Sequence, residues 1–367
     1  MKKLTLFIVS AFIIQASVYS QPCLPDGIIF TTQAQIDNFQ INYPGCTEIE
    51  GDVEIHGNNI TNLNGLSILT SIGGNLEISC CDSLNSLQGL HNVQIIGGYL
   101  HLSCNSFPNL DGLQTLTTIT GDFMFAGELN NLTGLENLQT IGGSVHFGYE
   151  TMGGTAHSLL ISMTGIENLN SIGGNLNIYC NSLLEGLTGL SGLTHIGENL
   201  SIRCNPALTS LTGLENIDAG SIERLFIEYN PNLSECAVQS ICDYLASPNR
   251  VIYIYGNATG CNNQQEVQEA CWIVNIGEGQ TAEDQITIYP NPLTSTAKLS
   301  GQFATAATVN ICIYNITGIC LKSWEFANHQ SGKQEFTLNL SDLPPGIYFL
   351  RLQVGNEVKT KKIIKVN

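Results

Sequence analysis

Carboxylates and imidazoles, which often act as acids, bases or metal ligands, recur along short segments where apolar and variable residues alternate. Glu54 and Glu77 share one position of neighbouring segments, and paired carboxylates can hydrolyse glycosidic bonds. No aspartate cluster or lysine joins them. His101 and His146 also share a position, but an intervening segment would keep them roughly 9 to 10 Å apart. That separation is too large for one metal ion to bind both, so we expect no metal site. We also expect no catalytic residue and no cofactor.

Charge is divided unevenly along the chain, whose formal net charge is -18. Residues 21–276 contain 24 Asp and Glu against three Arg and no Lys, whereas residues 285–367 contain eight Lys and Arg against four acids. Two segments of opposite charge joined by a short polar stretch indicate two domains. The acidic segment would repel a phosphate backbone, so nucleic-acid binding is not expected.

The segments that carry these side chains belong to a repeat. The second glycine of an Ile-Gly-Gly turn, or its replacement, recurs every 22 to 31 residues. A period in this range is typical of solenoids. The alternation after each turn predicts a half-buried strand, and we expect the turn glycines to adopt positive φ. The predicted inward positions form two ladders, Val53, Leu76, Leu100, Phe123, Val145, Leu176, Leu200 and Leu225, and Ile55, Ile78, Leu102, Phe125, Phe147, Ile178, Ile202 and Ile227.

A second apolar motif, Leu-x-Gly-Leu, follows the strand in most repeats, as at residues 87–90 and 211–214. One coil cannot bury its own apolar face, so stacking of coils must supply the stability. The step between Gly143 and Gly174 is 31 residues long and adds a loop at residues 149–158. Such insertions lie on one face of a solenoid, often the binding face. The candidate ligand-binding residues in this loop and on the outward strand positions are His101, His146, Tyr149, Tyr179 and Arg203.

Thirteen cysteines indicate an oxidising compartment, and the odd number leaves at least one unpaired. Cys80, Cys104, Cys180 and Cys204 occupy one position in four coils. Neighbours could pair across a parallel spacing of about 4.8 Å, or form a reduced, buried stack, which we favour because cysteine packs as a small apolar residue. Cys81 replaces an asparagine that recurs at residues 58, 105, 181, 205 and 230.

Six further cysteines flank the repeats and are candidates for disulfides that tie two caps. Two of them bracket a short segment before the first repeat. Four surround two helix-like stretches and a strand-like stretch at residues 251–255, where two bridges allow three connectivities. The six candidate disulfide cysteines are Cys23, Cys46, Cys236, Cys242, Cys261 and Cys271.

The unit Leu-x-Leu-x-x-Asn/Cys followed by Leu-x-Gly-Leu-x-x-Leu-x-x-Ile-Gly-Gly resembles the leucine-rich repeats, specifically the receptor L-domain variety. The resemblance covers about residues 46–235. It implies a right-handed solenoid with a binding surface, and a structural role for the recurring asparagine. No ligand-contact motif of those receptors matches here, so none is carried over.

Residues 285–367 read as short alternating segments separated by turn signals, which predicts a small antiparallel sandwich. Four ordered motifs resemble the C-terminal sorting domain of the type IX (Por) secretion system of Bacteroidetes. The resemblance implies recognition by the outer-membrane translocon and attachment to anionic lipopolysaccharide. Cys312 and Cys320 depart from the family pattern and could bridge two strands. The motif residues are Pro290, Asn291, Pro292, Gly318, Gly346, Tyr348, Lys361 and Lys362.

The N terminus has two lysines and then an apolar run ending near residue 16, which predicts a secretory signal peptide cut after Ser20. No later stretch approaches roughly 18 apolar residues. The expected organisation is a signal peptide (1–20), an N-terminal cap (21–49), a solenoid (50–235), a disulfide-rich C-terminal cap (236–276), a linker (277–284) and a sorting domain (285–367).

The sequence thus predicts a mainly β protein, with a leucine-rich-repeat, receptor L-domain-like solenoid followed by a small Ig-like antiparallel β-sandwich. We expect a secreted or cell-surface binding and adhesion protein that recognises a protein or glycan ligand and is not an enzyme. Its other expected partners are the type IX secretion machinery and lipopolysaccharide. A polysaccharide-active solenoid enzyme and a structural surface-layer component are the alternatives.

Overall fold

The computed structural model describes residues 22–105, 108–148, 159–274, 286–303, 307–315, 319–329, 332–354 and 357–366. The predicted signal peptide, the insertion at residues 149–158 and the linker at 277–284 lie outside these ranges. Among the residues described, no helix is long and apolar enough to cross a membrane.

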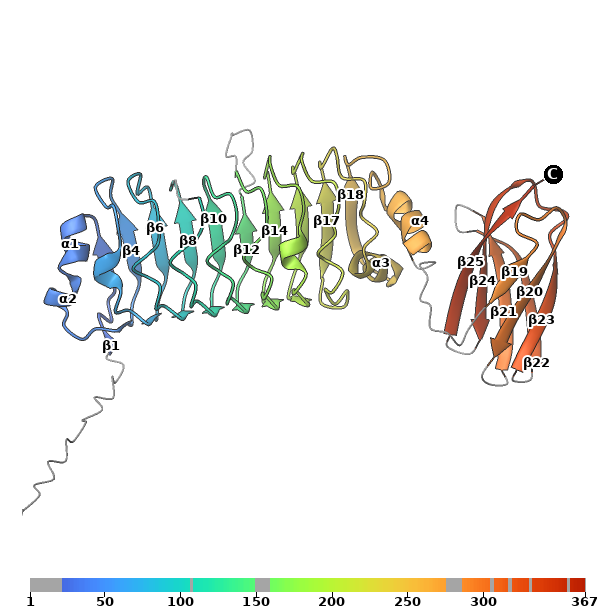
Figure 1. Ribbon diagram of the computed structural model, residues 1–367, viewed down its shortest axis with the longest axis horizontal. Helices are drawn as coiled ribbons and strands as arrows, with labels where there is room; N and C mark the ends of the chain where they lie inside the picture. The colour runs from blue at the N-terminus through green and yellow to red at the C-terminus, as the bar shows by residue number, and fades with distance from the viewer. Residues whose placement is uncertain are drawn as a thin grey trace, which may run out of the picture.

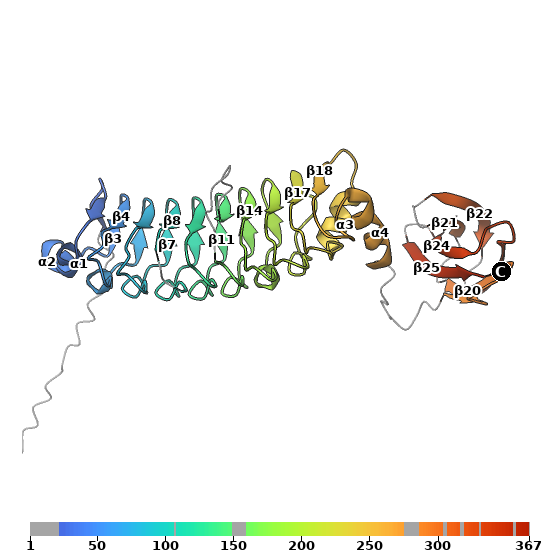
Figure 2. The same ribbon diagram turned by 90° about the horizontal axis from the view of Figure 1, so that it is seen from above.

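The chain begins with a β-solenoid of about nine turns, whose strands stack side by side along its length (Figures 1 and 2). Each turn adds one strand to a ten-stranded parallel sheet, and most turns add a two-residue strand to an eight-stranded parallel sheet. The ten strands are β2 (Ile28–Phe30), β4 (Val53–His56), β6 (Leu76–Ser79), β8 (Leu100–Ser103), β10 (Phe123–Ala126), β12 (Val145–Phe147), β14 (Leu176–Tyr179), β16 (Leu200–Arg203), β17 (Arg224–Glu228) and β18 (Val251–Tyr255). The eight are β1 (Pro22–Cys23), β3 (Glu48–Ile49), β5 (Ser71–Ile72), β7 (Ile95–Ile96), β9 (Thr118–Ile119), β11 (Thr140–Ile141), β13 (Ser171–Ile172) and β15 (His195–Ile196).

One continuous hydrophobic core fills the solenoid. Every residue of the two predicted inward ladders is at most 2% exposed, and the leucines of the Leu-x-Gly-Leu motifs are fully buried. Two of these motifs form short 3-10 helices, η1 (Asn64–Leu66) and η2 (Thr188–Leu190). The prediction of a mainly β solenoid with a stacked leucine and isoleucine core is therefore confirmed.

The Ile-Gly-Gly glycines were expected to be required for positive φ, and this reason is wrong. None of them adopts positive φ; they are required because stacked coils leave no room for a side chain. A Cβ on Gly73 would lie 2.5 Å from the carbonyl oxygen of Glu50 in the preceding coil. Positive φ instead occurs in the Leu-x-Gly-Leu motif, for example at Gly89, where φ is +113° and a Cβ would lie 2.1 Å from the oxygen of Leu63.

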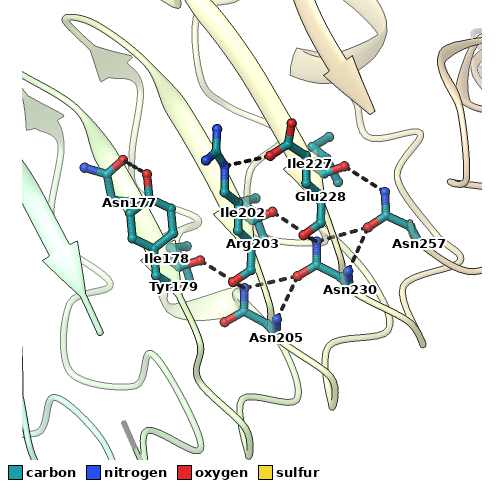
Figure 3. A network of polar contacts seen from close by, with 10 residues as sticks. All are labelled: Asn177, Ile178, Tyr179, Ile202, Arg203, Asn205, Ile227, Glu228, Asn230 and Asn257. Atoms are coloured by element: carbon teal, nitrogen blue, oxygen red, sulfur yellow. Dashed lines mark hydrogen bonds and ion pairs between the residues drawn. The ribbon is translucent and has the colours of Figure 1, made fainter. Parts of the chain in front are cut away.

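A ladder of buried asparagines joins the coils where each strand ends (Figure 3). The Asn205 amide nitrogen donates to the carbonyl of Ile178 at 3.0 Å, and its own backbone N–H donates to Oδ1 of Asn230 at 3.0 Å. Asn230 repeats both bonds with its neighbours, and Asn257 ends the ladder. Buried Cys81 takes the asparagine position, and its N–H donates to Asn105.

Two expectations about this corner of the coil are wrong. Asn58 is exposed rather than part of the buried ladder. Cys80 and Cys104 are also exposed and Cys180 and Cys204 half-buried, because the chain turns outward at their position instead of packing against the core.

Short helices and disulfides close both ends of the solenoid. Helices α1 (Gln33–Asp37) and α2 (Phe39–Asn42) cover the first coil, and a disulfide joins Cys23 to Cys46 with a Cα separation of 5.7 Å. At the other end lie α3 (Gln239–Ala246) and α4 (Gln264–Val274). Of the three possible connectivities of these four cysteines, the structure has one. Cys236 pairs with Cys261, and Cys242 pairs with Cys271.

The C-terminal domain consists of two antiparallel sheets around one shared core. Leu299 and Phe336 of one sheet and Ile311 and Leu350 of the other belong to that core. The three-stranded sheet contains β19 (Thr287–Tyr289), β20 (Thr296–Phe303) and β23 (Gly332–Asn339). The four-stranded sheet contains β21 (Ala307–Tyr314), β22 (Cys320–His329), β24 (Gly346–Val354) and β25 (Glu357–Lys365).

Candidate binding surface

Large polar and aromatic side chains gather on the outward face of the ten-stranded sheet, over its last four strands. They alternate with core residues, so that Leu225 and Ile227 of β17 point inward while Phe226 between them points outward. The strands are in parallel register, which places Tyr179 opposite Arg203 and Phe226 opposite Tyr253. We call this group the aromatic–arginine surface, and its members are Tyr179, Arg203, Phe226, Tyr229, Tyr253 and Tyr255.

Planar groups stack across these strands. The Cζ atom of Arg203 lies 4.6 Å from the ring centroid of Phe226 and 5.9 Å from that of Tyr179. Phe226 in turn stacks on Tyr253, with ring centroids 4.9 Å apart and an interplanar angle of 2°. Cation–π attraction and ring stacking therefore hold four side chains in a row across β14, β16, β17 and β18.

Glu228 fixes the orientation of Arg203. Its side chain is 5% exposed, and a carboxylate buried to this extent must be paired. Nε of Arg203 lies 2.9 Å from Oε2 of Glu228, as Figure 3 shows. The guanidinium is thus held by a charged partner and an aromatic face at once, which restricts its rotamers before any ligand arrives.

Three tyrosines form the exposed part of this surface. Tyr229, Tyr253 and Tyr255 are 55%, 47% and 43% exposed. The rings of Tyr229 and Tyr255 meet edge to face, with centroids 5.1 Å apart. A side-chain hydrogen bond to Tyr229, followed by desolvation, raises the pKa of Tyr255 to about 12. Exposed tyrosines beside an arginine are typical of binding hot spots.

A buried amide links His146 to this surface. Nδ2 of Asn177 lies 3.2 Å from Nδ1 of His146, and the hydroxyl of Tyr179 donates to Oδ1 of Asn177 at 2.9 Å. Asn177 is only 7% exposed. Burial lowers the pKa of His146, which favours the neutral imidazole, and its Nδ1 can then accept a hydrogen bond from the Asn177 amide. His146 therefore positions Tyr179 through Asn177.

The structure brings together three of the five candidate ligand-binding residues, His146, Tyr179 and Arg203. His101 lies apart from them, because Met124 of β10 stands between it and His146. It approaches Glu77 instead, with Nδ1 4.0 Å from Oε2. Tyr149 lies outside the described residues.

Sequence reasoning missed the aromatic half of the surface. Phe226 lies between the predicted inward residues Leu225 and Ile227 but is not among the predicted ligand contacts, and Tyr253 and Tyr255 belong to the strand-like stretch predicted to be part of the cap. The same stretch is β18, the last strand of the ten-stranded sheet. Its alternation of Tyr253 and Tyr255 with Ile252 and Ile254 was the signal that could have placed both tyrosines on the outward face.

The opposite end of the same face is acidic. Glu54 and Glu77 are partners in the register of β4 and β6, and the hydroxyl of Tyr99 donates to Glu77 at 3.5 Å. Within the described ranges, no group of three or more His, Cys, Asp or Glu side chains is arranged to hold a metal ion.

The first and last sorting motifs meet in the C-terminal domain. Nδ2 of Asn291 donates to the carbonyl of Lys362 at 2.9 Å, and its Oδ1 accepts from the N–H of Ile364 at 2.8 Å. Pro290 and Pro292 flank this asparagine, each after a cis peptide bond. The asparagine side chain therefore fastens the start of the domain to β25, more than 70 residues later in the chain.

The remaining motif residues divide between turn and surface. Tyr348 donates from its hydroxyl to the carbonyl of Pro344 at 2.6 Å, which braces the turn before Gly346, the first residue of β24. Lys361 and Lys362 are exposed on β25. Gly318 lies outside the described residues.

Residues 287–366 match the family described as Secretion system C-terminal sorting domain. The match shows that the C-terminal domain is a sorting domain, which supports export by the type IX secretion system and hence secretion or attachment at the cell surface. Comparison with curated proteins finds no match to the chain. The solenoid lies outside the matched residues.

Proposed function

We propose that this chain, exported through its sorting domain, binds a protein or glycan ligand through the aromatic–arginine surface and has no catalytic activity. One observation carries the proposal: Arg203 and the rings of Phe226 and Tyr253 are already stacked in place while three tyrosines remain exposed. Prearranged side chains lose little conformational entropy on binding. Tyrosine and arginine are also the residue types that dominate binding hot spots.

The repeat pattern supports a recognition role. Its leucine, asparagine and glycine positions resemble those of the receptor L-domain variety of leucine-rich repeats, and we propose membership of that class. Solenoids of this kind use one extended sheet face for binding. The described part of the outward face changes from acidic at β4 and β6 to aromatic at β17 and β18, with the charge of Arg203 on β16 paired to Glu228, so a ligand can be oriented as well as held.

Export and attachment complete the proposal. The predicted signal peptide would direct the chain across the inner membrane before the sorting domain engages the type IX translocon. Lys361 and Lys362 stay accessible on β25, which suits contact with the export machinery. We propose that the mature protein is joined to anionic lipopolysaccharide and displays the solenoid outside the cell.

A binding screen tests this function. The full chain is applied to arrays of glycans and of extracellular proteins, alongside the variant Phe226→Ala/Tyr253→Ala and the control Ile41→Ala. Ile41 is 74% exposed on α2, at the other end of the solenoid, so its loss removes apolar surface without touching the proposed site. We expect binding by the wild type and the control and a loss of at least tenfold in the double variant. Equal binding by all three would reject the surface.

A further inference from the structure

The cysteines that do not form cap disulfides are arranged in pairs. Six of the thirteen cysteines form the three cap disulfides. Cys81 is fully buried, and its thiol points to the carbonyls of Ile55 and Ser79. Two pairs, Cys80 with Cys104 and Cys180 with Cys204, directly follow strand residues that are partners in the register of adjacent coils. Cys312 and Cys320 lie on the adjacent strands β21 and β22 but out of register, since Cys312 pairs with Ser323 and Cys320 with Tyr314.

The four solenoid cysteines share a backbone conformation that their side chains disfavour. Each follows a strand of the ten-stranded sheet, and their φ values are 49°, 55°, 52° and 56° in chain order. Left-handed backbone is natural for glycine and uncommon for other residues, among which Asn, Asp and His lead. Glycine adopts this conformation directly after β12 and β18, where Gly148 and Gly256 have φ values of 86° and 70°, and Tyr229 adopts it after β17 with φ of 56°. Four cysteines at a position that suits glycine indicate a use for sulfur there.

Neighbouring cysteines of this set are within reach of each other. The N–H of Cys80 donates to the carbonyl of Ser103 at 3.0 Å, and that of Cys180 donates to the carbonyl of Arg203 at the same distance. Each cysteine therefore lies beside its counterpart in the next coil. Parallel strands lie about 4.8 Å apart, within the Cα range of about 4.4 to 6.8 Å that a disulfide spans. A side-chain hydrogen bond to Cys104, followed by desolvation, raises the pKa of the Cys80 thiol.

We propose that Cys80 with Cys104 and Cys180 with Cys204 are oxidised in the exported protein to disulfides that staple adjacent coils. In each pair two S–H bonds break and one S–S bond forms, while the S–S bond of a donor disulfide breaks. The two donor sulfur atoms take up the two electrons and the two protons and leave as thiols. The donor is a thiol–disulfide exchange partner of the oxidising compartment, of the class that must also oxidise the cap cysteines. Exposure of Cys80 and Cys104 gives such a donor access.

The two staples would act at different places along the solenoid. One joins the coils of β6 and β8, and the other joins those of β14 and β16, at the residues that directly follow Tyr179 and Arg203 of the aromatic–arginine surface. Each closes a loop of 24 residues and so resists separation of the two coils that it joins. The second staple would fix the spacing of Tyr179 and Arg203, independently of whether that surface binds a ligand.

Differential alkylation of the full exported chain tests the proposal. The protein is denatured in iodoacetamide without reductant, then reduced and labelled with N-ethylmaleimide, and each cysteine is read by peptide mass spectrometry. Only molecules with all three cap disulfides intact are scored. We expect Cys81 to carry the first label and the four solenoid cysteines to carry the second. The first label on Cys80, Cys104, Cys180 and Cys204 would overturn the proposal.

Variants separate pairing from general oxidation. In Cys104→Ser, Cys80 should take the first label while the Cys180–Cys204 pair is unchanged, and Cys204→Ser should give the converse. Cys320→Ser, in the C-terminal domain, should leave both solenoid pairs oxidised. If Cys104→Ser leaves Cys80 protected, its partner is not Cys104 and the assignment fails. Thiols that become reactive only after chelation of a bound soft metal would also contradict it.

Discussion

Arg203 on β16 bonds through Nε to the carboxylate of Glu228 on β17 at 2.9 Å, while its guanidinium lies against Phe226, 4.6 Å from the ring centroid. One side chain therefore neutralises a buried charge and completes a stack of planar groups. Arg203 thus contributes both to the stability of the solenoid and to the surface that we propose binds a ligand, and substitutions here should separate the two contributions.

Replacing Arg203 by methionine should lower stability, because the carboxylate of Glu228 would be left buried without its partner. Breaking a fully buried pair costs about 3 to 5 kcal/mol. The side chain of Arg203 is 21% exposed, so we expect a loss of about 1 to 3 kcal/mol in the free energy of unfolding. Urea unfolding measures it. The double variant Arg203→Met/Glu228→Gln should recover most of the loss, and a double variant less stable than the single one would contradict the pairing.

The stacking of coils predicts that replacement by alanine destabilises the protein at one glycine and has little effect at another. Gly89→Ala should destabilise by about 2 kcal/mol or more, because φ is +113° and the new Cβ would meet the Leu63 carbonyl at 2.1 Å. Gly186→Ala is the matched control, since a Cβ there meets nothing within 4 Å. Its unfolding temperature should stay within about 2 °C of wild type. Equal losses in the two variants would show that coil contact is not the cause.

The asparagine ladder should be essential to the interior coils. Asn230→Ala removes the acceptor for the Asn205 N–H and the donor to the carbonyl of Ile202. Each buried group left unsatisfied costs about 1 to 3 kcal/mol, so we expect a total of about 2 to 5 kcal/mol. Thermal unfolding provides the measurement. Asn232→Ala, at an exposed position two residues away, serves as the control. A ladder variant as stable as that control would refute the role.

Acid should destabilise the solenoid through His146. Burial lowers its pKa in the folded protein, so between that value and the unfolded value of 6.5 the unfolded chain binds more protons. The contribution of His146 is therefore complete above pH 6.5 and declines as the pH falls below it. The unfolding temperature should drop between pH 7.5 and 5.5, and His146→Gln should reduce that drop. An unchanged drop in the variant would assign the acid sensitivity to other groups.

The core could be predicted from the repeat, whereas the aromatic–arginine surface depends on side chains that occur only near the C-terminal end of the solenoid. Leu100 and Leu200 could be placed inward because each coil repeats the same alternation, and an error in one coil would be corrected by the next. Tyr253 could not be placed in the same way, since β18 follows a helix and lacks the Ile-Gly-Gly turn that marks other coils. The burial of Glu228 was equally hidden, because it depends on the side chains that stand around it on neighbouring strands.

The most direct test of the central claim is hydrogen-exchange footprinting of the full chain with and without the ligand found by the array screen. The account predicts that protection on binding is greatest in β16, β17 and β18, with loss of that protection in Phe226→Ala/Tyr253→Ala. Protection confined to β4, β6 and β8, or unchanged by the double substitution, would contradict it.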